Sequence, residues 1–284
     1  MLEEKVFIDE MYHNYFEIYR KPGGGHRVLI ISGIHGDEHS SIYTNMLLKD
    51  HINDHMDYDI TIIPIANMGA FLYRSRVSPY GGEDLNRIFP GKKNGSICER
   101  LADKIFSIAM DNDIIIDLHS CGFLCHPYIL ALYKHHKNIE NLTKMIDLQY
   151  VIESRGTGGQ LMTEVVKRGK NSIIIEMPSG FGGYIQKRVS ENIFHVLLDF
   201  LENKKPENKK FYLSQMEKVR SEEFGLFFPE NKILKNRLVK KDQRIGILNN
   251  KVIKSKRDGF LISVHFPSYV FKGEVLYEIA QVPS

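Results

Sequence analysis

The sequence predicts an α/β fold built around parallel strands, followed by a small antiparallel β domain. Short runs rich in Ile and Val recur at 27–33, 113–117 and 172–175, and such runs are typical of strands buried on both faces of a sheet. Segments of helical character separate these runs over the first 200 residues, which is the pattern of strand–helix–strand units. Beyond residue 205 the pattern changes to short alternating strands punctuated by glycines.

The elements of the first part are expected in a definite order. Strands are expected at 16–19, 27–33, 59–66, 113–118 and 172–177. The strand at 16–19 is expected at a sheet edge. The segment 127–133 precedes the strand at 172–177. Helices are expected at 37–49, 96–110 and 139–148, with a last helix capped by Ser190. Ser96 and Glu99 have the spacing of a capping box, which fixes the start of the second helix.

A segment with the composition of a linker, Asn-Lys-Lys-Pro-Glu-Asn-Lys-Lys at 203–210, ends the first part. We therefore expect one domain at 1–205 and a small β domain at 206–284. The strands of the second domain are expected at 224–228, 244–248, 259–265 and 274–280.

Composition limits the classes of function. A chain of 284 residues with 43% hydrophobic residues can bury a large core, and a net charge of +3 is too small to indicate a nucleic-acid partner. Neither an apolar run long enough to span a membrane nor a signal peptide is evident, so no membrane partner is expected. Cys98, Cys121 and Cys125 are too few for a disulfide framework, and we expect a reducing, cytoplasmic setting. Cys121, Cys125 and His126 follow His119 closely, but their spacing is not distinctive of a thiolate zinc site, so we expect Cys121 and Cys125 to be buried inert thiols.

Three apolar runs end at residues that can bind or serve a metal ion. The first runs into His35 and Glu38, the second into His119 and the third into Glu176. Open α/β sheets collect their sites at the carboxyl ends of parallel strands, so these side chains are expected to converge. Two imidazoles and a carboxylate form a zinc ligand set with one position open for water, and the further carboxylate is then available for proton transfer. The pattern predicts a zinc-dependent hydrolase.

The loop at 80–91, bounded by Gly and Pro, adds a second feature. Asn86 and Arg87 adjoin in it, and an arginine fork beside an amide donor suits a substrate carboxylate. Arg87 has the alternative of holding its own loop through Asp84. Arg74 and Arg76, shortly upstream, supply further positive charge for an oxyanion.

These motifs, in this order, resemble those of the succinylglutamate desuccinylase/aspartoacylase family, a branch of the zinc carboxypeptidase superfamily. The motifs are His35-Gly36-Asp37-Glu38, Asp84-Leu85-Asn86-Arg87-Ile88-Phe89-Pro90-Gly91, Asp117-Leu118-His119 and Ile174-Ile175-Glu176. The tail is similar to the family's small β domain, from Gly-Leu-Phe-Phe-Pro at 225–229 to Lys-Gly-Glu-Val-Leu at 272–276, so the resemblance covers nearly the whole chain. It implies a carboxypeptidase-like mixed sheet flanked by helices as the catalytic domain.

The resemblance also implies roles for single residues. His35, Glu38 and His119 would bind one Zn²⁺ per subunit, and Glu176 would activate the attacking water.

Asn86 and Arg87 would hold the free carboxylate of the substrate by the same resemblance. Arg76 would steady the carbonyl oxygen, with Arg74 as its rival for that role. Met177-Pro178-Ser179-Gly180 stand where many members have a small residue and glycines, so the pocket beside Glu176 is expected to differ from theirs.

The expected reaction is hydrolysis of an amide in a small, carboxylate-bearing substrate such as an N-acyl amino acid. A metallocarboxypeptidase acting on peptide C-termini would use the same groups, and a non-catalytic protein that binds an anionic ligand at its metal cleft is a third reading. The expected partner is a small anionic substrate. The subunit count stays open, and a homo-oligomer is compatible with the sequence.

Overall fold

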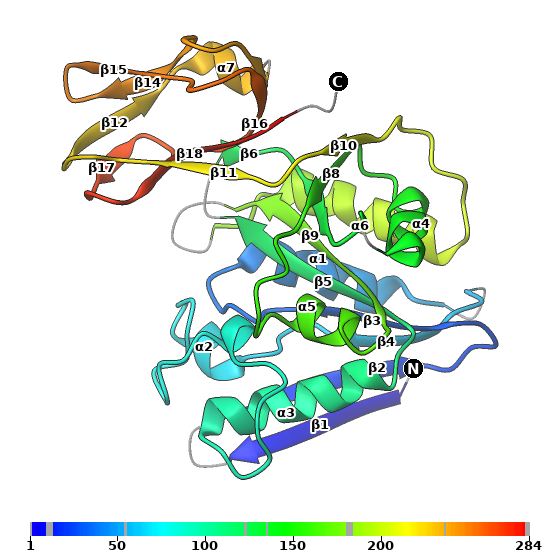
Figure 1. Cartoon of the computed structure of the whole chain (residues 1–284). Coiled ribbons are helices and arrows are strands. Elements are labelled where there is room, and N and C mark those ends of the chain that lie inside the picture. The colour runs from blue at the N-terminus through cyan, green and yellow to red at the C-terminus, as the bar shows by residue number, and fades with distance from the viewer. Residues whose placement is uncertain are drawn as a thin grey trace.

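The structure is a computed structural model that describes residues 2–9, 14–53, 56–121, 124–134, 136–179, 184–235 and 237–281. Its largest element is a nine-stranded mixed sheet, seen across the middle and lower part of Figure 1. In spatial order the strands are β1 (Leu2–Asp9), β2 (Asn14–Lys21), β4 (Asp59–Ile63), β3 (Arg27–Ser32), β5 (Ile114–Cys121), β9 (Asn171–Pro178), β7 (Tyr128–Ala131), β8 (Tyr150–Glu153) and β10 (Phe211–Leu213).

The centre of the large sheet is parallel and buried on both faces. β3 pairs in parallel with β4 and β5, and β5 pairs in parallel with β9. Val28 and Ile30 of β3 belong to one apolar cluster, whereas Leu29 and Ile31 belong to another. Alternate residues of a strand face opposite sides, so a strand covered on both sides is apolar throughout, as its sequence is. The predicted mixed α/β fold is confirmed.

Helices cover both faces of this sheet (Figure 1). α1 (His39–His51) and α6 (Lys187–Leu201) pack against each other on one face, and α3 (Ile97–Met110) lies on the other near β1 and β2. The remaining short helices are α2 (Met68–Leu72), the 3₁₀ turn η1 (Leu85–Arg87), α4 (Lys137–Met145), α5 (Leu161–Val166) and α7 (Asn231–Lys235). None of the helices in the described part of the chain is long and apolar enough to cross a membrane.

The C-terminal part, which we call the β module (residues 214–281), forms two small antiparallel sheets at the top of Figure 1. One sheet has the order β11-β18-β16-β13, and the other has the order β15-β14-β12-β17. The strands are β11 (Glu217–Arg220), β12 (Gly225–Pro229), β13 (Leu238–Val239), β14 (Arg244–Leu248), β15 (Lys251–Lys254), β16 (Gly259–Val264), β17 (Ser268–Val270) and β18 (Val275–Ala280).

The β module is attached to the large sheet by a strand and by packing. β6 (Leu124–Cys125), which follows β5 in the chain, pairs with β16 of the module. The rings of Tyr150 and Phe260 lie 4.2 Å apart, within a small apolar cluster shared by both parts. β10 lies beyond the linker-like segment and pairs with β8, so the large sheet continues to Leu213.

Two expectations about single elements are wrong. The strand at 16–19 is not at the sheet edge, because β1 pairs outside it. Ser190 does not cap α6, which begins at Lys187 after Gln186. The Ser190 hydroxyl instead donates a hydrogen bond to the carbonyl of Ser40, because this buried side chain faces α1 and joins the two helices.

The capping box of α3 is confirmed. The backbone N–H of Glu99 donates to Ser96 Oγ at 3.1 Å, and the backbone N–H of Ser96 donates to the Glu99 carboxylate at 2.9 Å. Two N–H groups that helix geometry leaves without partners are thereby satisfied.

Replacing Ser96 by alanine is expected to lower the free energy of unfolding by about 1 kcal/mol, because the Glu99 N–H loses its acceptor. Urea denaturation followed by circular dichroism measures this change. The matched control is Ser107→Ala, the same substitution at an exposed position inside α3. The control is expected to be neutral or slightly stabilising, since alanine favours helix interiors. Equal losses in both variants would contradict the capping argument.

Candidate metal centre and its cavity

A tight loop after β3 carries the first two predicted ligands. His35 follows the end of β3, and Glu38 is the residue before the first turn of α1. Between them, the Gly36 N–H donates to the carbonyl of Ser75 at 3.0 Å. A Cβ at Gly36 would lie 2.0 Å from the carbonyl carbon of Ala70, so the loop can pack here only with glycine. The loop thus holds both side chains at the carboxyl end of β3.

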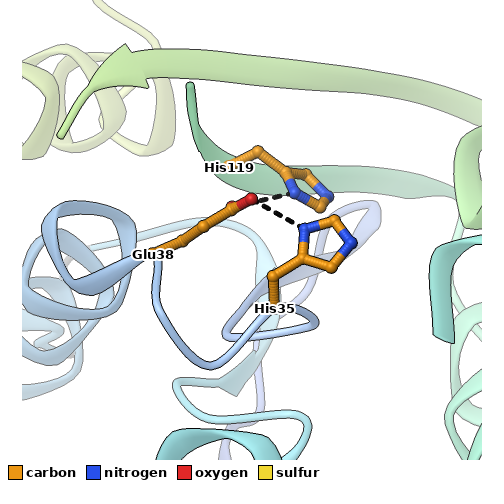
Figure 2. A group of neighbouring side chains, drawn as sticks. All are labelled: His35, Glu38 and His119. Atoms are coloured by element: carbon orange, nitrogen blue, oxygen red, sulfur yellow. Dashed lines mark hydrogen bonds and ion pairs between the residues drawn. The ribbon is translucent and has the colours of Figure 1, made fainter. Parts of the chain in front are cut away.

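The three predicted ligands meet at one point (Figure 2). Glu38 lies between the two imidazoles, with Oε1 2.7 Å from His35 Nδ1 and Oε2 3.0 Å from His119 Nδ1. All three residues are buried, and their ligand atoms lie within 4.8 Å of one another. The Ser120 N–H also donates to Glu38 Oε2, which fixes the carboxylate against β5. The prediction that these distant residues converge is therefore confirmed as geometry.

The outer nitrogen of each imidazole lies next to a second carboxylate. His35 Nε2 lies 3.1 Å from Asp84 Oδ1. His119 Nε2 lies 3.0 Å from Asp117 Oδ2, which is within ion-pair distance although its geometry is not that of a hydrogen bond. Carboxylates placed in this way orient an imidazole and raise its basicity, so that Nδ1 points to the common centre. Nδ1 of both histidines thus faces Glu38, and Asp84 orients the ring of His35 through its other nitrogen.

Burial and opposite charges compete within this group. Burial disfavours the ionised form of Glu38, but His119 and His35 outweigh it and hold the pKa of the carboxyl well below its usual range. Burial lowers the pKa of His119, but Asp117 and Glu38 outweigh it and raise that pKa well above its ordinary value. The fully buried Asp117 adds negative charge beneath the ligands. The surroundings of the three ligand atoms therefore favour a cation.

Glu176 stands on the neighbouring strand. The register of β5 and β9 places it directly beside His119, and it lines the same cavity. Burial raises the pKa of its carboxyl to about 7, opposed by the positive charge of His119 and supported by the negative charge of Glu38. A bound divalent cation would shift this pKa down again.

The three candidate ligands open into a cavity of about 330 Å³. Its walls come from both parts of the chain, since the β module contributes three residues beside those of the large sheet and its loops. The lining includes His35, Glu38, Arg76, Asn86, Arg87, His119, Tyr128, Glu153, Arg155, Glu176, Met216, Lys218 and Glu278.

The two candidate arginines of the upstream loop differ in position. Arg76 lines the cavity and forms an ion pair with Asp84 at 2.8 Å, and its Nη1 lies 3.4 Å from His35 Nδ1. Arg74 is exposed, has a left-handed backbone (φ 49°) and is not among the residues that line the cavity. Arg76 is therefore the arginine that stands beside the candidate metal site.

Asn86 and Arg87 both line the cavity, and each also has a local partner. Asn86 Oδ1 accepts a hydrogen bond from the Leu161 N–H, and its Nδ2 lies 3.3 Å from His119 Nε2. Arg87 Nη1 donates to the carbonyl of Asn86 at 2.6 Å. Asp84 is engaged by His35 and Arg76, so Arg87 holds its loop through a backbone carbonyl and not through Asp84 as considered above. The role of Asn86 and Arg87 toward a substrate stays a prediction.

The expectation that Cys121 and Cys125 are inert thiols is wrong. They form a disulfide, because the end of β5 and the short strand β6 bring their side chains together. Cys98 is a buried free thiol.

Sequence reasoning missed four residues that surround the ligands. Asp117 had a usable signal, since it lies two residues before His119 in one strand and so shares its face. Asp84 was considered only as a partner of Arg87. Lys218 and Glu278 carry no sequence signal, because only the docking of the β module brings them to the cavity.

Comparisons with known proteins show what this chain is similar to. Residues 24–203 match the family model described as the succinylglutamate desuccinylase/aspartoacylase catalytic domain. A curated relative, the N-alpha-acetyl-L-2,4-diaminobutyric acid deacetylase of Halomonas elongata, is 24% identical over 92% of this chain and 84% of its own length.

Two solved structures share the fold. The product-bound ectoine utilization protein EutE (DoeB) from Ruegeria pomeroyi superposes with a TM-score of 0.81 at 22% identity, over 94% of this chain and 88% of that one. A succinylglutamate desuccinylase/aspartoacylase from Rhodobacter sphaeroides gives a TM-score of 0.80 at 21% identity, over 95% of this chain and 89% of that one.

Replacing His35 by alanine is expected to remove stoichiometric metal from the purified protein, because one of three ligand atoms is lost. Elemental analysis should find one zinc per chain in the unmutated protein and much less in the variant. His26→Ala is the matched control, since its side chain is 76% exposed and does not line the cavity. A His35→Ala protein that keeps one zinc per chain would contradict the assignment.

Replacing Asp84 by asparagine is expected to weaken zinc binding by about 10- to 100-fold while leaving all three ligands in place. The amide keeps the size of the side chain but loses the charge that orients His35. Competition with a chromophoric chelator measures the affinity. Asp111→Asn, the same change at an exposed position after α3, is expected to bind zinc as the unmutated protein does. Unchanged affinity in Asp84→Asn would show that His35 does not depend on this carboxylate.

Proposed function

Because the chain belongs to the succinylglutamate desuccinylase/aspartoacylase family, we propose that it is a zinc-dependent hydrolase that removes the acyl group from an N-acyl amino acid. One observation carries this proposal. Two imidazoles and a carboxylate converge at a cavity, and a fourth group, the carboxyl of Glu176, stands on the next strand. The curated relative is named as a deacetylase of N-alpha-acetyl-L-2,4-diaminobutyric acid, so acetyl is the first acyl group to test.

The donor set of the site fits zinc. Imidazole nitrogen and carboxylate oxygen are ligands that Zn²⁺ takes, and three protein ligands are the number found in catalytic sites. The buried charges of Glu38 and Asp117 favour a cation at this place. When bound, the ion supplies Lewis acidity toward a substrate carbonyl and toward water.

Glu176 is proposed as the proton-transfer group. Its carboxyl faces the cavity beside His119, and therefore beside the place where the scissile amide would lie. There it would accept a proton from the attacking water and return that proton to the nitrogen of the leaving amine. This transfer lets the amine leave as a neutral group.

The arginines of the cavity are proposed to bind the two oxygen-bearing parts of the substrate. Arg76 is held by Asp84 with one guanidinium nitrogen near His35, which suits it to the carbonyl oxygen as negative charge develops. Arg87 presents an exposed guanidinium at the cavity, which suits it to the free carboxylate together with Asn86. A small anionic substrate thus remains the partner that we propose.

Replacing Glu176 by glutamine is expected to leave the zinc content unchanged and to lower kcat by about 10²- to 10⁴-fold, the range that proton-transfer groups contribute. Turnover is measured on zinc-loaded protein with N-acetyl amino acids as substrates. The matched control is Glu140→Gln on the surface helix α4, which is expected to keep full activity. An unchanged kcat in Glu176→Gln would exclude this residue as the base.

The same assay separates the candidate functions. Turnover of N-acyl amino acids supports the deacylase proposal, whereas turnover of short peptides alone would favour a metallocarboxypeptidase. Binding of N-acyl amino acids without turnover of either class would favour a non-catalytic binding protein.

A further inference from the structure

Three side chains of the β module form a row across neighbouring strands, and two of them line the cavity. Lys218 on β11 and Ser263 on β16 are the cross-strand neighbours of Glu278 on β18. Glu278 Oε1 lies 3.0 Å from Lys218 Nζ, and Glu278 Oε2 accepts a hydrogen bond from Ser263 Oγ at 2.7 Å. Lys218 and Glu278 line the cavity. The carboxylate is therefore held at its place by the strand on each side.

The charges of this wall lie at different depths. The side chain of Glu278 is only 6% exposed, whereas that of Lys218 is 50% exposed. Glu153, which also lines the cavity, is buried as well, whereas Arg155 is exposed. Among these four lining residues the carboxylates are thus buried and the cationic groups lie toward solvent. We call the two buried carboxylates, Glu278 and Glu153, the acidic wall.

Other lining residues carry positive charge. Arg76 and Arg87, neither of which is buried, line the cavity together with the candidate metal ligands. A carboxylate group and a carbonyl oxygen suit these residues, since two guanidinium groups would face them. The cavity thus combines exposed guanidinium groups with the buried carboxylates of the acidic wall.

The negative charge of Glu278 acts on two other residues that line the cavity, Tyr128 and Glu176. Burial is the largest cause that raises the pKa of Tyr128 and the pKa of Glu176. The negative charge of Glu278 raises both pKa values further. Tyr128 is itself the cross-strand neighbour of Glu176 and lines the cavity. Glu278 thus faces the space in which the substrate would be held.

We propose that Glu278 is a specificity residue that receives a cationic amino group on the amino-acid part of the substrate. The inference rests on the proposed deacylase function and names the substrate class more closely, as an N-acyl amino acid whose side chain ends in an ammonium group. Ser263 holds the carboxylate in place. Lys218, whose long flexible side chain is half exposed, neutralises Glu278 in the empty cavity and turns toward solvent when the substrate ammonium takes its place.

The alternative is that Lys218, and not Glu278, is the residue that binds the substrate. In that case Lys218 would bind an anionic group, and Glu278 would serve only to orient the lysine. The depth of the two side chains favours Glu278, because a buried carboxylate has already lost most of its contact with water and gains more from a charged partner. The two assignments predict different substrates and different effects of substitution.

The experiment compares N-acetyl amino acids that differ in side-chain charge, using zinc-loaded full-length protein. The cationic set is Nα-acetyl-2,4-diaminobutyrate, Nα-acetylornithine and Nα-acetyllysine, which places the ammonium at three distances. Nα-acetylnorleucine and Nα-acetylglutamine are neutral, and Nα-acetylglutamate is anionic. We expect one of the cationic substrates to have the highest kcat/KM. Glu278→Gln is expected to lower that value by about 10- to 100-fold and to change the neutral substrates by less than about 3-fold.

Two further variants separate specificity from folding. Glu217→Gln makes the same charge change one residue before Lys218 on β11, at a residue paired with Arg257 that does not line the cavity, and is expected to leave the substrate preference unchanged. Lys218→Gln is expected to keep or increase the preference for the cationic substrate, since it removes the competitor for Glu278. Thermal denaturation and zinc content check that each variant is folded and loaded.

A binding measurement gives a second readout. Calorimetry with the zinc-loaded protein should show tighter binding of the matching diamino acid than of norleucine, and Glu278→Gln should abolish the difference. Equal losses on cationic and neutral substrates, or a preference for the anionic substrate that Lys218→Gln removes, would overturn the inference but not the deacylase function. Absence of turnover with every N-acyl amino acid would instead contradict the proposed function, and the calorimetric comparison would then decide on Glu278 alone.

Discussion

The register of three parallel strands determines where the chemical groups of this protein lie. β3, β5 and β9 pair side by side, so the residues at their carboxyl ends, His35, His119 and Glu176, come to one edge of the sheet. Each strand is apolar on both faces, and a slip by one residue would turn every side chain to the other face. Burial of the Ile-rich strands therefore fixes the register, and the register fixes the site. Stability and function share the same residues here.

Around the candidate metal site, protons would compete with a metal ion for the same atoms. Asp117 and Glu38 favour the charged form of His119, yet an imidazole must be deprotonated at the ligating nitrogen to bind a metal. The carboxylates would serve a metal ion as they serve the proton, because they supply negative charge to either cation. The loop after β3 adds rigidity, since Gly36 packs directly on the backbone of Ala70. The ligands thus meet in a prearranged geometry.

The sequence predicts the parts of the molecule that depend on local pattern. The buried strands, the Ser96 capping box and the residues at the strand ends can be predicted because each follows from spacing along the chain. Features that depend on partners distant in the sequence cannot be predicted in this way. Ser190 resembles a helix cap but bonds Ser40 on another helix, and the strand β1 has no apolar alternation strong enough to mark it as the true edge. The acidic wall follows only from the docking of the β module against the cavity.

The contacts of the β module bear on its role, which is either to bind another protein or to complete the cavity. β6, which directly follows the strand of His119, is hydrogen-bonded to β16 of the module, and the disulfide between Cys121 and Cys125 joins β6 to the end of β5. Met216, Lys218 and Glu278 then complete the cavity wall. A unit that served only to bind another protein would need none of these contacts. The proposed roles follow this architecture, because the large sheet carries the groups proposed for bond cleavage and the module carries Lys218 and Glu278, which are proposed to act on the side chain of the substrate.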